Sequence, residues 1–460
     1  MSIPVIAVFD IGRTNKKIFL FDEDYRIVYE TETHLNETKD EDGFECEDVN
    51  VLTQWVKDSI SKVVGLNEFD IKAISISAHG ASFVNINENG IPTTPLYNYL
   101  KPFPELLQKQ FYNDYGNDLP KITASPVLGN LNSALQLYWI RHTLPETFLK
   151  IKYSLHLPQY ISYVLTGDVS SDITSIGCHT HLWDFEKNQY HPWVTKEELI
   201  NRLPPIRQAD EIQNTFIDKR NIPTGIGLHD SSAALIPYLK SFTDPFILIS
   251  TGTWCISLNP FNHLPLTDEE LTKDCLCYLS YEGKPVKAAR LFAGHEHEEQ
   301  IKRIASHFYQ KDDFYKNVDY NEALALNLKK QTSPLLENEF HGGTQSSAFV
   351  QRKLDSFTTS EEAYHQLIID IVNQQVISTL LVLKMTTVNR IFVDGGFSKN
   401  PIYMNLLAAA VPDLKVYGAS VAQASALGAA LVLHQHWNSK PIPTNLIELN
   451  DYGDAHLMNL

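Results

Sequence analysis

A polar, glycine-containing loop separates two apolar runs near the N-terminus. The first run, Val5–Phe9, ends at Asp10, and the second begins at Ile18. Two such runs joined by a short polar loop predict a β-hairpin. Because Gly12 lets a ligand approach the backbone closely, the loop can bind phosphate through its N–H groups. The other candidates here are the hydroxyl of Thr14, the amide of Asn15, the charge of Lys17, and Asp10 as the holder of a cation that bridges phosphates.

A second stretch repeats this pattern far downstream. The apolar run that begins at Phe246 ends in Ser250, the loop Thr251-Gly252-Thr253 follows, and Trp254–Leu258 returns. Each half of the chain therefore opens with a phosphate-type hairpin. This repetition predicts a duplicated architecture with a nucleotide held between the halves.

Asp230 allows two interpretations. It follows the glycine pair Gly225 and Gly227 and precedes the small residues Ser231–Ala234, which predict a helix that starts at Asp230. An aspartate at a helix start is often an N-cap. Alternatively, the helix holds the carboxylate at a cleft, where it can take a proton from a substrate hydroxyl. The glycine pair before it and the phosphate hairpin after it favour the second interpretation.

The strand predicted over Ile71–Ser77 is followed by His79 and Gly80. Ligands commonly bind at the carboxyl edge of such a strand. His79, the Gly80 backbone and Ser82 could therefore contact a polyol, or His79 could simply close the strand. The residue types and positions leave both interpretations open.

Glycines also follow the strand predicted over Arg390–Val393. Gly395 and Gly396 allow close backbone approach, and a helix beginning near Pro401 would offer unpaired N–H groups and a positive dipole end. With Ser and Asn before that helix, this is a nucleotide-type turn, although any tight turn can supply a glycine pair.

Other segments give coarser expectations. The acidic segment Glu30–Asn50 lacks apolar periodicity and predicts a loop with Glu45, Glu47 and Asp48 in solvent. Apolar spacing predicts helices over Val49–Val64, Leu131–Arg141, Ile151–Thr166, Ala288–Ser306, Glu361–Thr387 and Ala422–His434, and a strand over Arg26–Glu30.

Three groups of metal-type residues are interpreted as structural. His179 and His181 would share one face of a strand, but no third ligand follows at a recognisable spacing. The run His295–Glu299 lacks the His-Glu-x-x-His order of a zinc protease helix and is interpreted as a charged helix face. Cys275 and Cys277 have no matching pair elsewhere and are expected at alternate positions of a strand.

Length and composition indicate a globular protein of two or three domains. The chain has 460 residues, of which 43% are hydrophobic and 20% charged. Its net charge of −17 argues against a nucleic-acid partner. We recognise neither a signal peptide nor an apolar stretch long enough to span a bilayer, and therefore expect no membrane partner. Five cysteines, an odd number, favour the cytoplasm over a disulfide framework.

Taken together and in this order, these stretches resemble the motifs of the FGGY family of carbohydrate kinases, within the actin-like ATPase superfamily. The likeness covers nearly the whole chain. FDIGRTNKK resembles the first phosphate motif, GLHDSSAA the catalytic-base motif, STGTW the second phosphate motif, VDGGFSKNP the adenosine motif, and SAHGASFV the sugar-contacting segment.

The resemblance implies a role for each matched residue. Asp230 would be the catalytic base and would contact Mg²⁺ together with Asp10. The residues implied for the sugar are His79, Gly80, Ser82, His229 and Asp230. Those implied for ATP are Gly12, Arg13, Thr14, Asn15, Lys17, Thr251, Gly252, Thr253, Gly395, Gly396, Phe397 and Asn400.

Four positions depart from the family pattern. Arg13 stands in place of a common Thr, Gln136 of a Lys, and Gln423 of a Glu, and PLYNYLKP lacks the aromatic-Asp-x-x-Arg sequence that many members place after the sugar segment. The last departure leaves the sugar open. The STGTW motif and the segment Leu165–Thr174 look closest to kinases of L-fuculose and L-rhamnulose, with xylulose- or ribulose-type kinases next.

The resemblance therefore implies an α/β fold of two actin-like, ribonuclease H-like domains, residues 1–242 and 243–460, with an ATP-Mg²⁺ cleft between them. Each domain would have a mixed central sheet that includes three antiparallel strands. The implied reaction is ATP-dependent phosphorylation of a ketose hydroxyl. A non-catalytic ATP-binding sugar sensor and a plain ATPase of the same fold are the alternatives, and a homodimer would be unsurprising.

Overall fold

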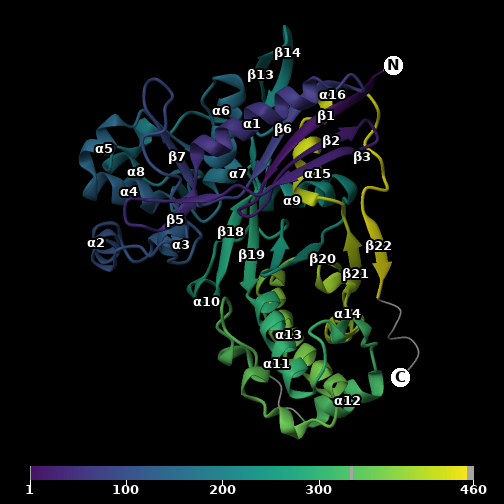
Figure 1. Ribbon diagram of the computed structural model, residues 1–460. Helices are drawn as coiled ribbons and strands as arrows, with labels where there is room; N and C mark the ends of the chain where they lie inside the picture. The colour runs from purple at the N-terminus through teal and green to yellow at the C-terminus, as the bar shows by residue number, and fades with distance from the viewer. Residues whose placement is uncertain (1, 332–334, 453–460) are drawn as a thin grey trace. The chain divides into compact units, whose positions relative to one another are not determined.

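The computed structural model describes residues 2–331 and 335–452. Contacts divide the chain into two compact units (Figure 1). The first unit consists of Met1–Ser241, Cys277–Pro285 and Ala422–Leu446, and the second of Phe242–Leu276, Val286–Val421 and the residues from Ile447 onward. The chain thus crosses to the second unit after Ser241 and later contributes two further segments to the first.

A mixed β-sheet organises the first unit. β1 (Ile3–Ile11), β2 (Lys16–Asp22) and β3 (Ile27–Thr33) form an antiparallel meander, and β6 (Phe69–Ala78) lies parallel to β1. Beyond β6 the sheet continues with β14 (Arg220–Gly225) and β13 (Ile212–Ile217), while β15 (Leu228–His229) pairs with the C-terminal end of β6. The three antiparallel strands expected from the first hairpin are confirmed.

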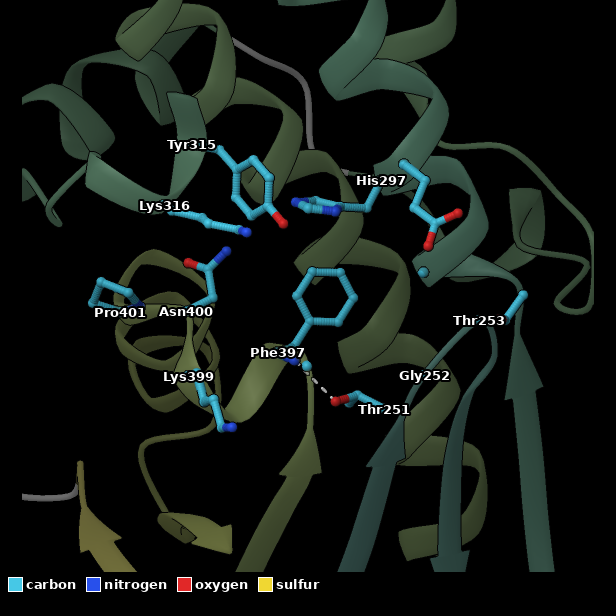
Figure 2. Close-up of a pocket in the computed structure, with 13 residues that line it drawn as sticks. Thr251, Gly252, Thr253, His297, Tyr315, Lys316, Phe397, Lys399, Asn400 and Pro401 are labelled. Atoms are coloured by element: carbon cyan, nitrogen blue, oxygen red, sulfur yellow. Dashed lines mark hydrogen bonds between the residues drawn. The ribbon is translucent and has the colours of Figure 1, made fainter. Parts of the chain in front are cut away.

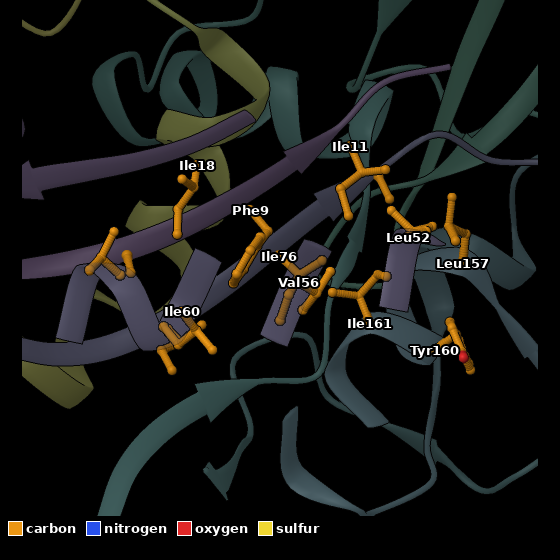
Figure 3. Close-up of a cluster of buried hydrophobic side chains, with 14 of the residues drawn as sticks. Phe9, Ile11, Ile18, Leu52, Val56, Ile60, Ile76, Leu157, Tyr160 and Ile161 are labelled. Carbon is orange, nitrogen blue, oxygen red and sulfur yellow. The ribbon is translucent and has the colours of Figure 1, made fainter. Parts of the chain in front are cut away.

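The apolar core of this unit forms between the sheet and two helices, α1 (Val49–Val64) and α6 (Leu157–Thr166) (Figure 3). Asp48 starts α1 as its N-cap, accepting hydrogen bonds from two backbone N–H groups of the first turn. Apolar residues of α1 at steps of three and four then face the core. The fully buried residues there include Phe9 and Ile11 of β1, Leu52 and Val56 of α1, and Ile161 of α6. Alternate residues of β1, including Asp10, therefore point to the opposite side of the sheet.

Two helices, α9 (Asp230–Ser241) and α15 (Ala424–Val432), pack closely against each other. A Cβ atom on Gly428 of α15 would lie 1.8 Å from the carbonyl oxygen of Ala233 of α9, so only glycine fits there. α15 also contacts β1 and β6. This packing brings the start of α15 and the start of α9 to the C-terminal ends of the central strands.

The remaining elements of the first unit are short. The strands are β4 (Glu37–Lys39), β5 (Glu45–Glu47), β7 (Phe83–Ile86), β8 (Tyr153–His156), β9 (Ser171–Asp172), β10 (Trp183–Asp184), β11 (Gln189–Tyr190) and β12 (Ile206–Arg207). The helices are α2 (Glu105–Tyr115), α3 (Leu119–Ile122), α4 (Ala134–Thr143), α5 (Pro145–Lys150), α7 (Ile173–Ile176), α8 (Pro192–Lys196) and α16 (His434–Trp437).

The sheet of the second unit repeats the plan of the first. β16 (Ile247–Thr251) pairs antiparallel with β17 (Cys255–Asn259), and β17 pairs antiparallel with β19 (Pro285–Leu291). β20 (Arg390–Gly395) lies parallel to β16. The order is β18 (Cys275–Leu279), β19, β17, β16, β20, β21 (Lys415–Ser420) and β22 (Glu448–Asp451). A mixed sheet with three antiparallel strands is thus confirmed here also, as is the strand that carries Cys275 and Cys277.

The helices of the second unit are α10 (Asp268–Thr272), α11 (Ala293–His307), α12 (Glu322–Gln331), α13 (Ser360–Leu383) and α14 (Pro401–Ala410). By length and composition α13 could cross a membrane, so the expectation that no stretch is long enough does not hold for it. However, 72% of its apolar window is buried inside the structure, which is typical of a core helix. It packs against α11, α14 and β17.

Several local expectations are wrong. The acidic segment forms the β4–β5 hairpin, and Glu47 is only 9% exposed because two cationic or hydrogen-bonding partners replace its water. The helix predicted from Ile151 begins only at Leu157, after strand β8. The helix predicted from Ala288 begins at Ala293, because Ala288–Leu291 belongs to β19. His179 and His181 are not on a strand, since both have positive φ angles.

Candidate active site

Asp10 lies near the C-terminal end of β1, where its carboxylate accepts hydrogen bonds from the hydroxyl of Ser425 at 3.1 and 3.0 Å. Burial raises the pKa of Asp10 to about 6 against the effect of these hydrogen bonds. The negative charge of Asp230 raises the pKa further, whereas the charge of Lys17 lowers it. The two carboxylates are thus close enough to repel each other.

This carboxylate pair fits a divalent cation. A cation beside Asp10 and Asp230 would remove the repulsion between them, and Mg²⁺ is typically bound by one or two carboxylates plus phosphate oxygens. Over residues 2–331 and 335–452, no cluster of three or more His, Cys, Asp or Glu forms a complete protein cage for a metal. The arrangement therefore suits a cation that arrives with a phosphate ligand.

The loop of the first hairpin closes on itself. The N–H of Gly12 donates to the carbonyl of Asn15 at 3.0 Å, and the ammonium group of Lys16 donates to the carbonyls of Gly12 and Arg13. Thr14 is exposed, and the buried Oδ1 of Asn15 has no hydrogen-bond partner. The loop therefore keeps its shape through Lys16, while the exposed side chain of Thr14 remains available to a ligand.

The two remaining cations of this hairpin already have protein partners. Arg13 donates to the side chains of Asn98 at 2.7 Å and Glu37 at 2.9 Å. Lys17 lies opposite Asp10 in the register of β1 and β2, and its ammonium nitrogen is 3.2 Å from a carboxylate oxygen of Glu32. Each would have to exchange or share these partners to reach a phosphate.

Asp230 is the first residue of α9, and its side chain is 35% exposed. Its Oδ1 accepts a hydrogen bond from the N–H of Ser231 and lies 3.3 Å from Nε2 of His229. Burial lowers the pKa of His229, so the imidazole is neutral near pH 7. Asp230 is therefore an accessible carboxylate beside a neutral ring, an arrangement in which it can accept a proton.

The segment after β6 meets His229 directly. A Cβ atom on Gly80 would lie 2.6 Å from the ring of His229, so glycine is required for this contact. The imidazole of His79 is 3.0 Å from the carboxylate of Glu47. Ser82 is buried, and its carbonyl accepts a hydrogen bond from the N–H of Leu157. The structure thus brings His79 and Gly80 near Asp230 and ties Ser82 to the start of α6.

The loop of the second hairpin lines a cavity of about 550 Å³ in the second unit, a size typical of small-ligand sites. Its lining includes Thr251, Gly252, Thr253, Gly396, Phe397 and Asn400 from the sequence-based set. Gly395 does not line the cavity but supports it. With a φ of +79° and a hypothetical Cβ 1.8 Å from the carbonyl oxygen of Thr251, this position excludes other residues.

Figure 2 shows the residues that line the cavity. The Thr251 hydroxyl accepts a hydrogen bond from the N–H of Phe397 at 3.0 Å, which joins the second hairpin to the glycine turn. The Phe397 ring stacks on Tyr403 with 4.6 Å between centroids. His297 of α11, whose pKa burial lowers to about 4, lies edge-on to Phe397. The cavity thus offers aromatic surface with a neutral imidazole.

Asn400 has a structural task in addition to its place at the cavity. Its Oδ1 caps α14 by accepting from the N–H groups of Ile402 and Tyr403, and its Nδ2 donates to the hydroxyl of Tyr364. The helix expected near Pro401 is confirmed. The oxygen and the nitrogen of the Asn400 amide both form hydrogen bonds within the protein. A ligand in the cavity would therefore contact this side chain mainly by van der Waals packing.

Sequence reasoning missed several residues of these sites. Lys16 gave no signal because Lys17 carries the family-like position, and Glu47 was hidden in an acidic segment. Ser425 lies in a run of small residues far along the chain, and His297 and Tyr315 lie in segments without a recognised motif. Only the folded chain brings these side chains to the motifs.

Comparisons with known proteins show which family this chain resembles. Residues 5–236 match the N-terminal domain of the FGGY family of carbohydrate kinases, and residues 243–441 match the carbohydrate kinase FGGY C-terminal domain. A rhamnulokinase of Halalkalibacterium halodurans is 23% identical over 54% of this chain, and the chain spans 52% of that protein. The L-fuculokinase of Haemophilus influenzae is 21% identical over 93% of both chains. The probable L-xylulose kinase of Pasteurella multocida is 23% identical over 93% of this chain and 90% of its own.

A solved carbohydrate kinase structure from Novosphingobium aromaticivorans has the same fold. It superposes with a TM-score of 0.79 at 23% identity, covering 98% of this chain and 94% of the other. The predicted α/β fold class is therefore confirmed. Since the two domain matches cover most of the chain, this protein belongs to the FGGY family of carbohydrate kinases.

Proposed function

We propose that this protein transfers the γ-phosphoryl group of ATP to a hydroxyl of a ketose, in particular a deoxy-ketohexose such as L-fuculose or L-rhamnulose. The observation that carries the proposal is the juxtaposition of Asp10 and Asp230. One carboxylate is partly buried and has a raised pKa, and the other is partly exposed at a helix start. Two carboxylates in different environments can take the separate roles of cation ligand and proton acceptor.

Asp230 would act on the sugar. Both hydrogen bonds from Ser231 go to Oδ1 of its partly exposed carboxylate, so the other oxygen can orient a substrate hydroxyl and accept its proton during in-line attack. The neutral ring of His229 lies beside it and can contact the sugar without competing as a cation. His79 and Gly80 would complete the sugar side of this site.

Asp10 would act on the nucleotide. With Ser425 holding its carboxylate in place, Asp10 together with Asp230 would hold Mg²⁺, which when bound supplies charge to offset that on the phosphoryl oxygens. The N–H groups of the loop Gly12–Asn15 would contact phosphate. In the second unit, the cavity would bind the nucleotide, with Phe397 offering a ring surface and Thr251–Thr253 offering N–H and hydroxyl groups.

The names of the relatives support the sugar class. The L-fuculokinase match extends over nearly the whole of both chains, and the rhamnulokinase match adds a second kinase of a deoxy-ketohexose. The probable L-xylulose kinase match is equally long and makes a pentulose the second candidate. The identities of 21 to 23% leave the choice to experiment.

A coupled ADP-release assay with Mg-ATP tests the proposal, with products identified by mass spectrometry. The panel would contain L-fuculose, L-rhamnulose, D- and L-xylulose, L-ribulose and glycerol. We expect one deoxy-ketohexose to raise turnover sharply and to yield the mass of its phosphate ester. A phosphopentulose instead would support the second candidate. ATP binding without any phosphosugar would contradict the kinase assignment and favour a sensor, and sugar-independent hydrolysis would indicate an ATPase.

A further inference from the structure

We propose that Glu47 is a positioning residue that couples the phosphate loop Gly12–Asn15 to the sugar segment His79–Ser82. The inference deepens the proposed function and rests on it, because it assumes that the loop contacts nucleotide phosphate. Glu47 belongs to β5, which forms a hairpin with β4. Its side chain lies between Lys16 and His79, and we call these three side chains the Glu47 bridge.

On the phosphate side, the bridge is attached to the backbone of the loop. One oxygen of Glu47 is 2.7 Å from the ammonium nitrogen of Lys16. That nitrogen also donates to the carbonyl oxygens of Gly12 at 3.1 Å and Arg13 at 2.8 Å. A change in the peptide orientation of the loop would therefore alter the hydrogen bonds of Lys16 and, through it, the position of Glu47.

On the sugar side, the bridge is attached to the segment that touches the proposed base. The other oxygen of Glu47 is 3.0 Å from Nε2 of His79. The second ring nitrogen of His79 is 3.1 Å from the carbonyl of Gly80, which fixes the ring on this segment. Gly80 in turn packs on the ring of His229, next to Asp230. The bridge is therefore linked to the proposed catalytic base through Gly80 and His229.

The bridge is shielded from water. Lys16, Glu47 and His79 are 2%, 9% and 7% exposed. Although burial alone would raise it, contacts with His79 and Lys16 hold the pKa of Glu47 below its usual value, so Glu47 is ionised at neutral pH. Buried charges depend strongly on their partners, because removing one partner leaves the other without compensation. Movement of Lys16 or His79 away from Glu47 is thus opposed by the other two side chains of the bridge.

The hairpin that carries Glu47 is itself held from several sides. The ammonium of Lys101 lies 2.7 Å from Asp40 and 2.6 Å from Asp42, and the hydroxyl of Tyr97 donates to Glu41 at 2.6 Å. These contacts anchor the turn of the hairpin. The anchored hairpin therefore holds Glu47 in a fixed position. This is expected for a residue that positions other residues and does not itself contact a ligand.

Hydrogen exchange of the full chain with and without Mg-AMP-PNP, a non-hydrolysable ATP analogue, tests this inference. We expect the analogue to slow exchange in peptides that contain Thr251–Thr253, Gly12–Asn15 and His79–Ser82. In Glu47→Gln, protection of the first two should persist, whereas protection of His79–Ser82 should fall by about fivefold or more, as expected for the loss of a typical coupling between sites.

A matched variant controls for the loss of a buried charge. Glu270 forms a comparably buried ion pair with Lys287 at 2.9 Å in the second unit, so Glu270→Gln removes the same chemistry elsewhere. In Glu270→Gln, the analogue should protect His79–Ser82 to the same extent as in the wild type. If Glu47→Gln does not fold, the double variant Lys16→Met/Glu47→Gln removes both charges together. Because Lys16 also holds the loop, its readout is the loss of protection at His79–Ser82 relative to Thr251–Thr253 alone.

The outcomes separate the two proposals. Undiminished nucleotide protection of His79–Ser82 in the folded Glu47 variants would overturn the coupling role. The same holds if the wild type shows protection at Thr251–Thr253 but none at His79–Ser82. Absence of protection at Thr251–Thr253 in the wild type would instead contradict nucleotide binding, and with it the proposed function. With the sugar found by the panel assay, Glu47→Gln should also lose the improvement in sugar affinity that the analogue produces, a readout that a purely structural role would not change.

Discussion

The hydroxyl of Ser425 donates to both carboxylate oxygens of Asp10, although the two residues are 415 positions apart in the chain. The contact exists because α15 packs against β1 and against α9, the helix that begins with Asp230. One helix from the C-terminal part of the chain thus positions both proposed catalytic carboxylates. The first phosphate motif is therefore incomplete without a residue that belongs to none of the recognised motifs.

Replacing Asp10 by Asn should weaken Mg-nucleotide binding and stabilise the free protein at pH 8. The amide cannot supply a carboxylate to Mg²⁺, but it avoids an ionised group in a buried position. Because the pKa of Asp10 is raised to about 6, its contribution to the free energy of unfolding is complete below about pH 4 and lost as the pH rises through 6. Calorimetric titration with Mg-ADP and thermal melts at pH 5 and 8 measure both effects.

Asp24→Asn, in the turn after β2 where the Asp24 side chain is 44% exposed, is the control and should change neither nucleotide affinity nor the melting temperature. An Asp10→Asn variant that binds Mg-ADP like the wild type would contradict the role of Asp10 as a cation ligand.

The stability of the protein should contain a pH-dependent contribution from Asp172. This carboxyl is completely buried, and burial raises its pKa to about 7 against hydrogen bonds from Thr174. Its stabilising contribution is therefore present below about pH 4 and disappears as the pH rises to 7. As the pH rises from 5 to 8, the melting temperature of Asp172→Asn should increase by a few degrees relative to that of the wild type. A difference between variant and wild type that does not change over this range would show that Asp172 does not titrate there.

The two glycines of the turn after β20 should respond differently to alanine. Gly395→Ala places a Cβ against the carbonyl of Thr251 at a positive φ, and should cost about 2 kcal/mol or more of stability. It should also weaken nucleotide binding, since that carbonyl and the Thr251 hydroxyl shape the cavity wall. Gly396→Ala meets no atom within 4 Å and should leave the melting temperature unchanged. Equal melting temperatures for the two variants would refute this account of the turn.

The sequence identifies the motif-bearing turns because their chemistry is local. A glycine loop between two apolar runs predicts the hairpins at Gly12 and Gly252, and the strand–glycine–helix order predicts the turn at Gly395 whatever the rest of the chain does. Apolar periodicity likewise predicts α1 with its observed bounds.

What the sequence misses depends on tertiary contacts. Glu47 looks like a solvated acid, because its burial depends on Lys16 of β2 and on His79, which follows β6. Ala288–Leu291 looks helical because a short buried strand has no alternation to distinguish it from a buried helix. Ser425 and His297 carry no local signal, and only the packing of α15 and α11 brings them to Asp10 and to the cavity of the second unit.

The central claim is tested most directly by comparing the wild type with Asp230→Asn, using the sugar found by the panel assay and detecting the phosphosugar by mass spectrometry. Loss of a general base typically costs about 10²–10⁴ in rate, so we expect turnover to fall by that factor while the affinity for ATP stays nearly unchanged. An Asp230→Asn variant that forms the phosphosugar at the wild-type rate would contradict the assignment of Asp230 as the base.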